Sequence, residues 1–200
     1  MNRDCYTMPN RPRPVTVRRR SDFAAPKAAD VPEIVTVDKA TECHVTPMDV
    51  AARMVGYLGR RGDFLTLEPS AGTGNLSRAL LDAGHSRYEL CQIERHVKLA
   101  AGLHQFGPVI NRCFLEYAEE VRGKVQFPRI IMNPPFRHVR QHIAAAKSLM
   151  GRNGHDCPAV LVALVPVTFE DPAAELLEIL GPDTFALAKV NTKIIRITGD

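Results

Sequence analysis

The sequence contains no tryptophan, few aromatic residues (6%) and no apolar run of membrane-spanning length. Met1 is not followed by the apolar stretch of a secretory signal peptide. The protein is therefore expected to work without a membrane. With 200 residues, 45% of them hydrophobic and 24% charged, the chain suits one globular domain with a sizeable core.

Cysteine is also scarce, and no two of the five cysteines have the CxxC spacing of a zinc ribbon. An odd, dispersed set argues against a disulfide framework. His142 has no paired carboxylate or cysteine at ligand spacing, so no metal is expected. We interpret the cysteines as reduced thiols in a cytoplasmic compartment. They are Cys5, Cys43, Cys91, Cys113 and Cys157.

Positive charge is concentrated at the front of the chain. Residues 1–27 carry seven basic and two acidic side chains, a net charge of +5, so the total of +4 leaves −1 for the rest. Five prolines and few large apolar side chains predict that residues 1–33 form a flexible basic arm, followed by a folded domain over 34–200. The arm suits nucleic-acid phosphates, which Arg18, Arg19 and Arg20 would contact. A solubilising tail or a targeting peptide is the alternative.

Strand-like and helix-like patterns alternate after the arm. Strands are predicted at 64–68, 88–94, 108–114, 128–133, 159–167, 185–190 and 193–198. Helices are predicted at 75–84, 97–106, 115–122, 138–150 and 171–180, after a first helix with Thr46 as N-cap and Pro47 as its first residue. This alternation is typical of an α/β fold with a mostly parallel, twisted sheet and helices on both faces. The last two strands are too close for a crossover and predict an antiparallel hairpin.

The stretch LEPSAGTGNL (67–76) links the first predicted strand to a helix. Gly72 and Gly74 let the backbone approach a ligand, and the helix start offers free N–H groups. The loop lacks the Lys-Ser/Thr of a phosphate-binding Walker motif. Glu94 ends the next strand, where a carboxylate can accept both hydroxyls of a ribose. The pair indicates a nucleoside-bearing cofactor, unless Glu94 only caps the following helix.

The stretch NPPF (133–136) ends another strand and therefore faces the same edge of the sheet. The two prolines hold the backbone rigid and extended. The side-chain oxygen of Asn133 and the carbonyl of Pro134 are both acceptors, which together can receive the two hydrogens of a planar amino group. Phe136 offers a ring on which a heteroaromatic base can stack.

Together, EPSAGTGNL and NPPF resemble the motifs of S-adenosylmethionine-dependent DNA methyltransferases of the N6-adenine type, over roughly residues 44–200. The resemblance implies a Rossmann-like class I methyltransferase fold, S-adenosyl-L-methionine as cofactor, and transfer of its methyl group to the N6 amine of a flipped adenine. It assigns the target base to Asn133, Pro134, Pro135 and Phe136. It assigns the cofactor to Thr46, Glu68, Pro69, Ala71, Gly72, Gly74 and Glu94.

The sequence departs from this family in two places. Cys113 stands where an acidic residue usually binds the adenine of the cofactor, with Asn111 or a backbone group as a substitute and Phe114 packing against the ring. In addition, no separate target-recognition domain fits after Phe136. We therefore expect low specificity, or DNA contacts from the arm, from a protein partner, or from Arg137, His138 and Arg140. The last three otherwise belong to a solvated helix face.

Three functions remain open at this level. The first is methylation of adenine in DNA, which the EPSAGTG form of the loop favours and for which a phage or mobile-element origin would suit the small size. The second is methylation of RNA adenine or of a protein glutamine. The third is a non-catalytic nucleic-acid-binding or regulatory subunit with the same fold, which the intact NPPF stretch disfavours.

The arm provides a test that does not depend on the chemistry. Deletion of residues 1–33 removes most of the basic excess, so DNA binding should weaken more at low salt than at high salt. Binding titrations of both proteins at several salt concentrations would measure the two slopes of log K against log[salt]. Equal slopes would reduce the arm to a tail.

Overall fold

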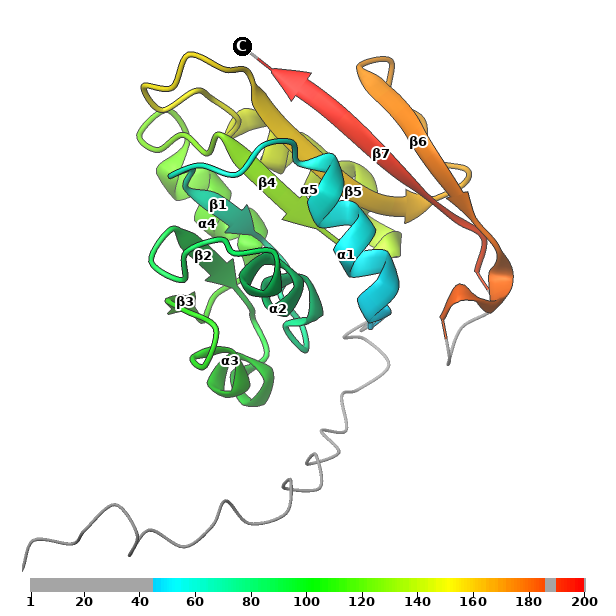
Figure 1. Cartoon of the computed structure of the whole chain (residues 1–200), viewed down its shortest axis with the longest axis horizontal. Helices are drawn as coiled ribbons and strands as arrows, with labels where there is room; N and C mark the ends of the chain where they lie inside the picture. The colour runs from blue at the N-terminus through cyan, green and yellow to red at the C-terminus, as the bar shows by residue number, and fades with distance from the viewer. Residues whose placement is uncertain (1–44, 186–189, 200) are drawn as a thin grey trace, which may run out of the picture. The chain divides into compact units, whose positions relative to one another are not determined.

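The computed structural model describes residues 45–185 and 190–199. The predicted arm, with Arg18, Arg19 and Arg20, lies outside the described residues, as does most of the strand predicted at 185–190. The described residues form one seven-stranded sheet with the strand order β3-β2-β1-β4-β5-β7-β6 (Figure 1).

Five strands of this sheet pair in parallel, and the last two join it through antiparallel pairings, so that only β7 runs against the others. The parallel strands are β1 (Thr66–Glu68), β2 (Leu90–Ile93), β3 (Val109–Ile110), β4 (Arg129–Met132) and β5 (Ala159–Pro166). Strand β7 (Thr192–Gly199) pairs antiparallel with β5, and β6 (Ala174–Leu180) pairs antiparallel with β7. This confirms the predicted mostly parallel sheet with a C-terminal antiparallel hairpin. The strands on the two sides of β7 are β5 and β6, however, whereas the sequence predicted residues 185–190 as its hairpin partner.

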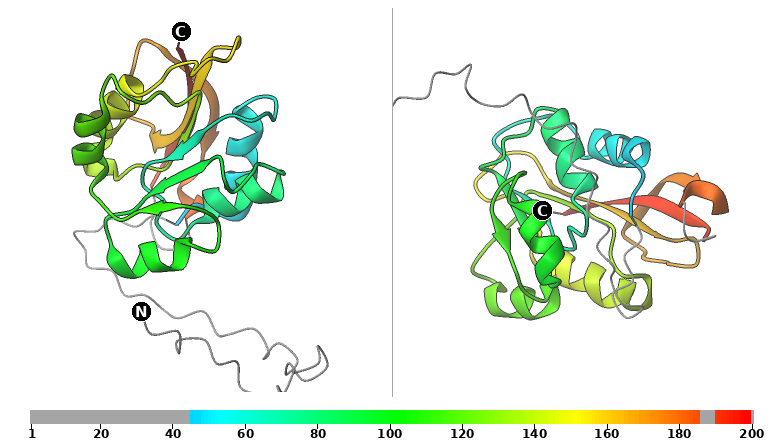
Figure 2. Two further views of the ribbon diagram at one scale, coloured as in Figure 1. Left: turned by 90° about the vertical axis from the view of Figure 1, so that its left-hand side faces the viewer. Right: turned by 90° about the horizontal axis from the view of Figure 1, so that it is seen from below.

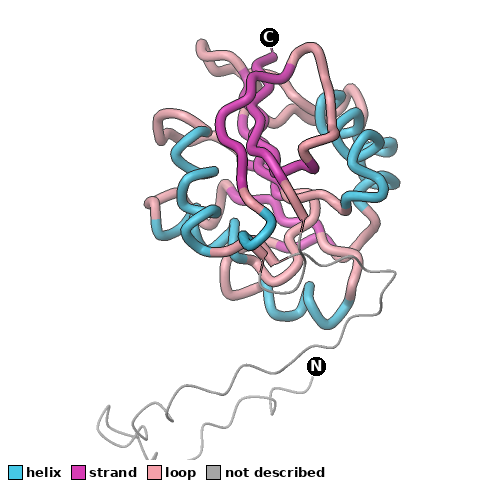
Figure 3. The backbone as a smooth tube through the Cα atoms, turned by 90° about the vertical axis from the view of Figure 1, so that its right-hand side faces the viewer, coloured by secondary structure: helices cyan, strands magenta, loops and turns pink. Residues whose placement is uncertain are grey.

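Helices cover both faces of the sheet, as predicted (Figures 2 and 3). One face carries α1 (Met48–Tyr57), α2 (Asn75–Asp82) and α3 (Val97–Leu103), and the other carries α4 (Phe114–Val121) and α5 (Val139–Ser148). The alternation of β4 explains the two cores, because Ile131 packs with the first set and Ile130 and Met132 pack with the second. Across the described ranges, no helix is both long and apolar enough to cross a membrane.

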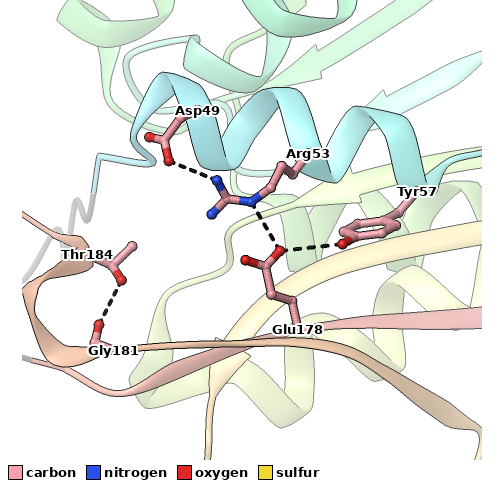
Figure 4. A network of polar contacts seen from close by, with 6 residues as sticks. All are labelled: Asp49, Arg53, Tyr57, Glu178, Gly181 and Thr184. Carbon is pink, nitrogen blue, oxygen red and sulfur yellow. Dashed lines mark hydrogen bonds and ion pairs between the residues drawn. The ribbon is translucent and has the colours of Figure 1, made fainter.

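The prediction of a helix at 171–180 is wrong, because residues 174–180 form strand β6. The apolar spacing there also suits an edge strand, and pairing with β7 supplies the backbone hydrogen bonds that decide between the two. Glu178 fixes β6 against α1: its Oε2 accepts from Arg53 Nε at 3.1 Å and from the Tyr57 hydroxyl at 3.4 Å. Arg53 also pairs with Asp49 at 2.9 Å (Figure 4).

The predicted start of α1 also needs correction. The helix begins at Met48 with Pro47 as its N-cap, and no side chain caps it. The carbonyl of Pro47 accepts the N–H of Ala51 at 2.9 Å, so the helix starts one residue later than expected. The Thr46 side chain is free for another partner, which belongs to the functional site.

Two short 3₁₀ turns complete the described chain. They are Phe136–His138, directly after the NPP stretch, and Pro182–Thr184, after β6. The first turn carries the chain from β4 into α5, so it orients the residues that follow Asn133.

Gly74 provides a stability test of this packing. It is the N-cap of α2 with φ +82°, and a Cβ there would lie 2.6 Å from Phe106 and 2.7 Å from Leu103. Gly74→Ala should lower the free energy of unfolding by about 2–5 kcal/mol, through left-handed strain and overpacking. Gly59→Ala is the matched control, because Gly59 has φ +93° but no atom near its Cβ position, and should cost about 1 kcal/mol. Urea titration measures both, and equal losses would contradict the packing argument.

Candidate active site

A cavity of about 430 Å³ lies where the carboxyl ends of four parallel strands meet. Its walls come from the loops that follow β1, β2, β3 and β4, and from the stretch before α1. Ligands of open α/β sheets bind at this edge, where the strand order reverses. The volume falls in the usual range for small-molecule sites, roughly 300–1,000 Å³.

The Glu94 carboxylate joins two loops of this cavity. Its Oε2 accepts the N–H of Gly72 at 2.8 Å, and its Oε1 accepts the N–H of His96, the N-cap of α3, at 2.7 Å. Glu94 is 7% exposed and lines the cavity. Glu94 therefore does contact the start of the following helix, α3, which was the alternative role considered for it in the sequence analysis. Each oxygen keeps a second lone pair, so the predicted ribose contact is compatible with both bonds.

Thr46 and Asn133 join the NPPF stretch to the first loop. Asn133 Nδ2 donates to Thr46 Oγ1 at 3.0 Å, and Asn75 Nδ2 at the start of α2 donates to the Thr46 carbonyl at 2.8 Å. Thr46 is 5% exposed, and Asn133 lines the same cavity as Gly72 and Glu94. The bond to Thr46 orients the Asn133 amide, because its nitrogen side is directed at the hydroxyl and its oxygen lies on the other side.

The rest of the NPPF stretch is divided between the cavity and the core. Pro135 lines the cavity, whereas Pro134 is buried behind it. The Phe136 ring packs edge-to-face on Phe185, with centroids 6.4 Å apart, and joins the core on the α1 side of the sheet. Pro134 and Phe136 are therefore not among the lining residues.

Glu68, at the end of β1, belongs to a buried polar chain. Its carboxyl hydrogen-bonds the Ser77 hydroxyl, and Ser77 Oγ also lies 2.7 Å from Gln92 Oε1. Gln92 Nε2 donates to the carbonyls of Leu103 and Pro108, each at 3.3 Å, so its oxygen must face Ser77. One hydroxyl hydrogen cannot serve two acceptors. A protonated Glu68 that donates to Ser77, which then donates to Gln92, satisfies every atom.

The electrostatics agree with this proton count. Burial raises the pKa of Glu68 from 4.5 to about 8, the Ser77 hydrogen bond lowers it, and the nearby charge of Glu94 raises it. Glu68 is 1% exposed and lines the cavity. At neutral pH the side chain is thus a carboxylic acid.

At the β3 end, the cavity wall is formed by Cys113 and Phe114, at the start of α4. Asn111 is occupied elsewhere: its Nδ2 donates to the carbonyls of Glu94 at 2.7 Å and of Arg95 at 3.2 Å. Asn111 does not line the cavity, so the structure disfavours it as a substitute for the missing acid. His142 of α5 stands there instead, with its ring centroid 5.8 Å from that of Phe114.

Basic side chains gather on the cavity wall. Arg137 and His138, which the sequence singled out, are joined there by two residues that it missed, Arg95 and Arg112. Arg140 does not share this position: its guanidinium carbon lies 5.7 Å from the centroid of the Phe169 ring, in a separate shallow groove. The only available signal for Arg95 was its place directly after Glu94.

The structure thus brings most of the predicted cofactor residues to one cavity. The residues that line it are Thr46, Glu68, Pro69, Ala71, Gly72, Glu94, Cys113 and Phe114. Gly74 does not line the cavity, because the position of a Cβ on this residue points toward Leu103 and Phe106 instead. Among the described residues, no group of three or more His, Cys, Asp or Glu side chains is placed to hold a metal ion.

Comparisons with known proteins match the chain by structure but not by sequence. No family model matches, and no curated protein matches. The methyltransferase subunit of a type I restriction-modification system from Streptococcus thermophilus superposes with a TM-score of 0.63 and 14% identity, over 80% of this chain and 47% of that one. A candidate RNA methyltransferase from Pyrococcus horikoshii gives 0.56 and 17%, over 82% and 91%.

A third structure, a candidate methyltransferase from Escherichia coli, gives a TM-score of 0.56 and 14% identity, over 76% of this chain and 88% of that chain. At these identities, the likeness shows a shared fold. The chain has the Rossmann-like fold of the methyltransferases, as the resemblance in the sequence implied.

The protonated Glu68 gives a pH-dependent prediction. Between pH 4.5 and about 8, the folded protein holds a proton that the unfolded chain has released. Raising the pH through this window should therefore lower the free energy of unfolding, by up to ~1.4 kcal/mol per pH unit. Glu68→Gln cannot ionise, so its stability should fall less over the same range.

Urea unfolding at pH 5, 7 and 9 would measure the difference between the two proteins. Glu116→Gln, at an exposed position of α4, serves as the control and should follow the original protein at every pH. A constant difference between Glu68→Gln and the original protein across this range would rule out a protonated Glu68.

Proposed function

We propose that this protein is a methyltransferase that moves the methyl group of S-adenosyl-L-methionine to the exocyclic N6 amine of adenine in DNA. One observation carries the proposal: Asn133 of the NPPF stretch lines the same cavity as Gly72 and Glu94. The residues proposed to hold the cofactor and the residue proposed to hold the amine therefore line one cavity at a single edge of the sheet.

The cavity suits this cofactor chemically. Glu94 would accept the ribose hydroxyls, and the backbone of the loop at Ala71 and Gly72 would border the methionine part, near Glu68 and Thr46. Phe114 and Leu99 offer apolar wall for the purine. When bound, the cofactor supplies an electrophilic methyl group on a sulfonium.

The role of the NPPF stretch follows from the weak nucleophilicity of an aromatic amine, whose lone pair is delocalised into the ring. Acceptors on both hydrogens, from Asn133 Oδ1 and the Pro134 carbonyl, would favour a more tetrahedral nitrogen with higher electron density. The Thr46 hydroxyl aids this by accepting from Asn133 Nδ2 at 3.0 Å, which holds the amide in one orientation. Phe136, which packs on Phe185 but is only half-buried, would stack on the extruded base with the exposed part of its ring. Catalysis is then mainly positioning.

Nucleic acid as the substrate is supported by basic side chains on the cavity wall, since Arg137 and His138, which directly follow the NPPF stretch, would meet phosphates beside an extruded base. The Streptococcus thermophilus neighbour belongs to a restriction-modification system and the Pyrococcus horikoshii neighbour is a candidate RNA methyltransferase, so the choice of DNA rests on the EPSAGTG form of the loop. The Streptococcus thermophilus neighbour is one subunit of its system, and by analogy we propose that a protein partner supplies target recognition here.

The decisive experiment measures transfer of labelled methyl from S-adenosylmethionine to unmethylated DNA. Asn133→Ala should lower the rate by roughly a hundredfold or more, because it removes a positioned acceptor from the reacting amine. Its affinity for S-adenosylhomocysteine should stay within a few-fold. Asn153→Ala, the same substitution in an exposed turn before β5, is the control and should keep full activity.

The competing functions predict other outcomes. Labelled RNA or labelled glutamine in protein, with DNA unlabelled, would replace the DNA substrate. Cofactor binding without transfer to any of the three would indicate a non-catalytic subunit. Lack of cofactor binding in the folded protein would refute the proposal as a whole.

A further inference from the structure

The inference concerns the recognition of the cofactor base, and it rests on the proposed function. If Glu94 at the end of β2 holds the ribose, the base lies on the side away from Asn133, toward the end of β3. The wall there includes Cys113, Phe114 and His142. Neither Cys113 nor Phe114 provides a strong acceptor for an amino group. Asn111 is bound to the carbonyls of Glu94 and Arg95.

His142 has a defined tautomer. Its Nδ1 lies 3.1 Å from the carbonyl oxygen of His138, one helical turn earlier, and a carbonyl can only accept. The proton of a neutral imidazole must therefore be on Nδ1, and Nε2 on the far side of the ring is an acceptor. His142 is 8% exposed, on the well-packed helix α5, so this orientation is held firmly.

We propose that Nε2 of His142 accepts a hydrogen bond from the amino group of the cofactor's adenine. His142 would thereby do what the acidic residue does in the family that the sequence resembles, where this chain has Cys113. The Phe114 ring, tilted by 37° from the imidazole, would contact the face of the purine while His142 contacts its edge.

The charge state of His142 agrees with this role. Burial lowers the pKa of the imidazole, the His138 carbonyl raises it, and the nearby positive charges of His138 and Arg95 lower it further. A neutral ring keeps the Nε2 lone pair, whereas an imidazolium would present a second donor to the amino group.

The test uses two ligands that differ only at the base. S-adenosylhomocysteine has an amino group at position 6, and its hypoxanthine analogue has a carbonyl oxygen there, which cannot donate. Calorimetric titration of the full chain should show roughly ten- to a hundredfold weaker binding of the analogue, because two acceptors would face each other. The affinities of His142→Phe for the two ligands should lie within about threefold of each other, because the variant loses affinity for S-adenosylhomocysteine.

His142→Gln is the matched variant, since its amide oxygen can reach the position of Nε2, and it should keep most of the discrimination. The inference is overturned if the original protein binds both ligands equally, or if His142→Phe still discriminates between them. These outcomes leave the proposed function intact. If S-adenosylhomocysteine does not bind the original protein, both proposals fail together.

Discussion

The site depends on the two hydrogen bonds that the Glu94 carboxylate accepts. Parallel strands that end at one edge leave loops whose N–H groups need partners, and a buried carboxylate needs donors just as strictly. Glu94 meets both needs by accepting from Gly72 in the loop after β1 and from His96 at the start of α3. The cavity therefore has a defined shape because one side chain holds two loops that the chain connects only through α2 and β2.

Two carboxyl groups line this cavity, and their surroundings separate their roles. Glu68 is sealed in a chain with Ser77 and Gln92 whose hydrogen count is complete only with the acid protonated. The charge of Glu94 adds to the burial that raises the pKa of Glu68. Glu68 thus acts as an internal donor that ties β1 to α2 and β2. Glu94 faces the loops and is placed to receive a ligand.

The two halves of the site are coupled through Thr46, a residue that precedes both motifs in the chain. Its hydroxyl holds the Asn133 amide and its carbonyl holds Asn75 at the start of α2. The geometry of the NPPF stretch therefore depends on the loop that would hold the cofactor. Structural neighbours share this fold at 14–17% identity, so the scaffold tolerates nearly complete sequence change.

The sequence alone determined the alternation of strands and helices, the loop with Gly72, the acid at the end of β2 and the rigid NPPF stretch. These features depend on local backbone preferences and on hydrophobic periodicity. It could not decide residues 174–180, whose apolar spacing suits a helix or a strand, until pairing with β7 and the bonds from α1 to Glu178 selected the strand. Nor could it show what surrounds Thr46, Gly74 and His142, which lie against Asn133, against Leu103 and Phe106, and against Phe114, respectively. Contacts between residues far apart in the chain form only when the sheet is complete, so tertiary structure alone settles them.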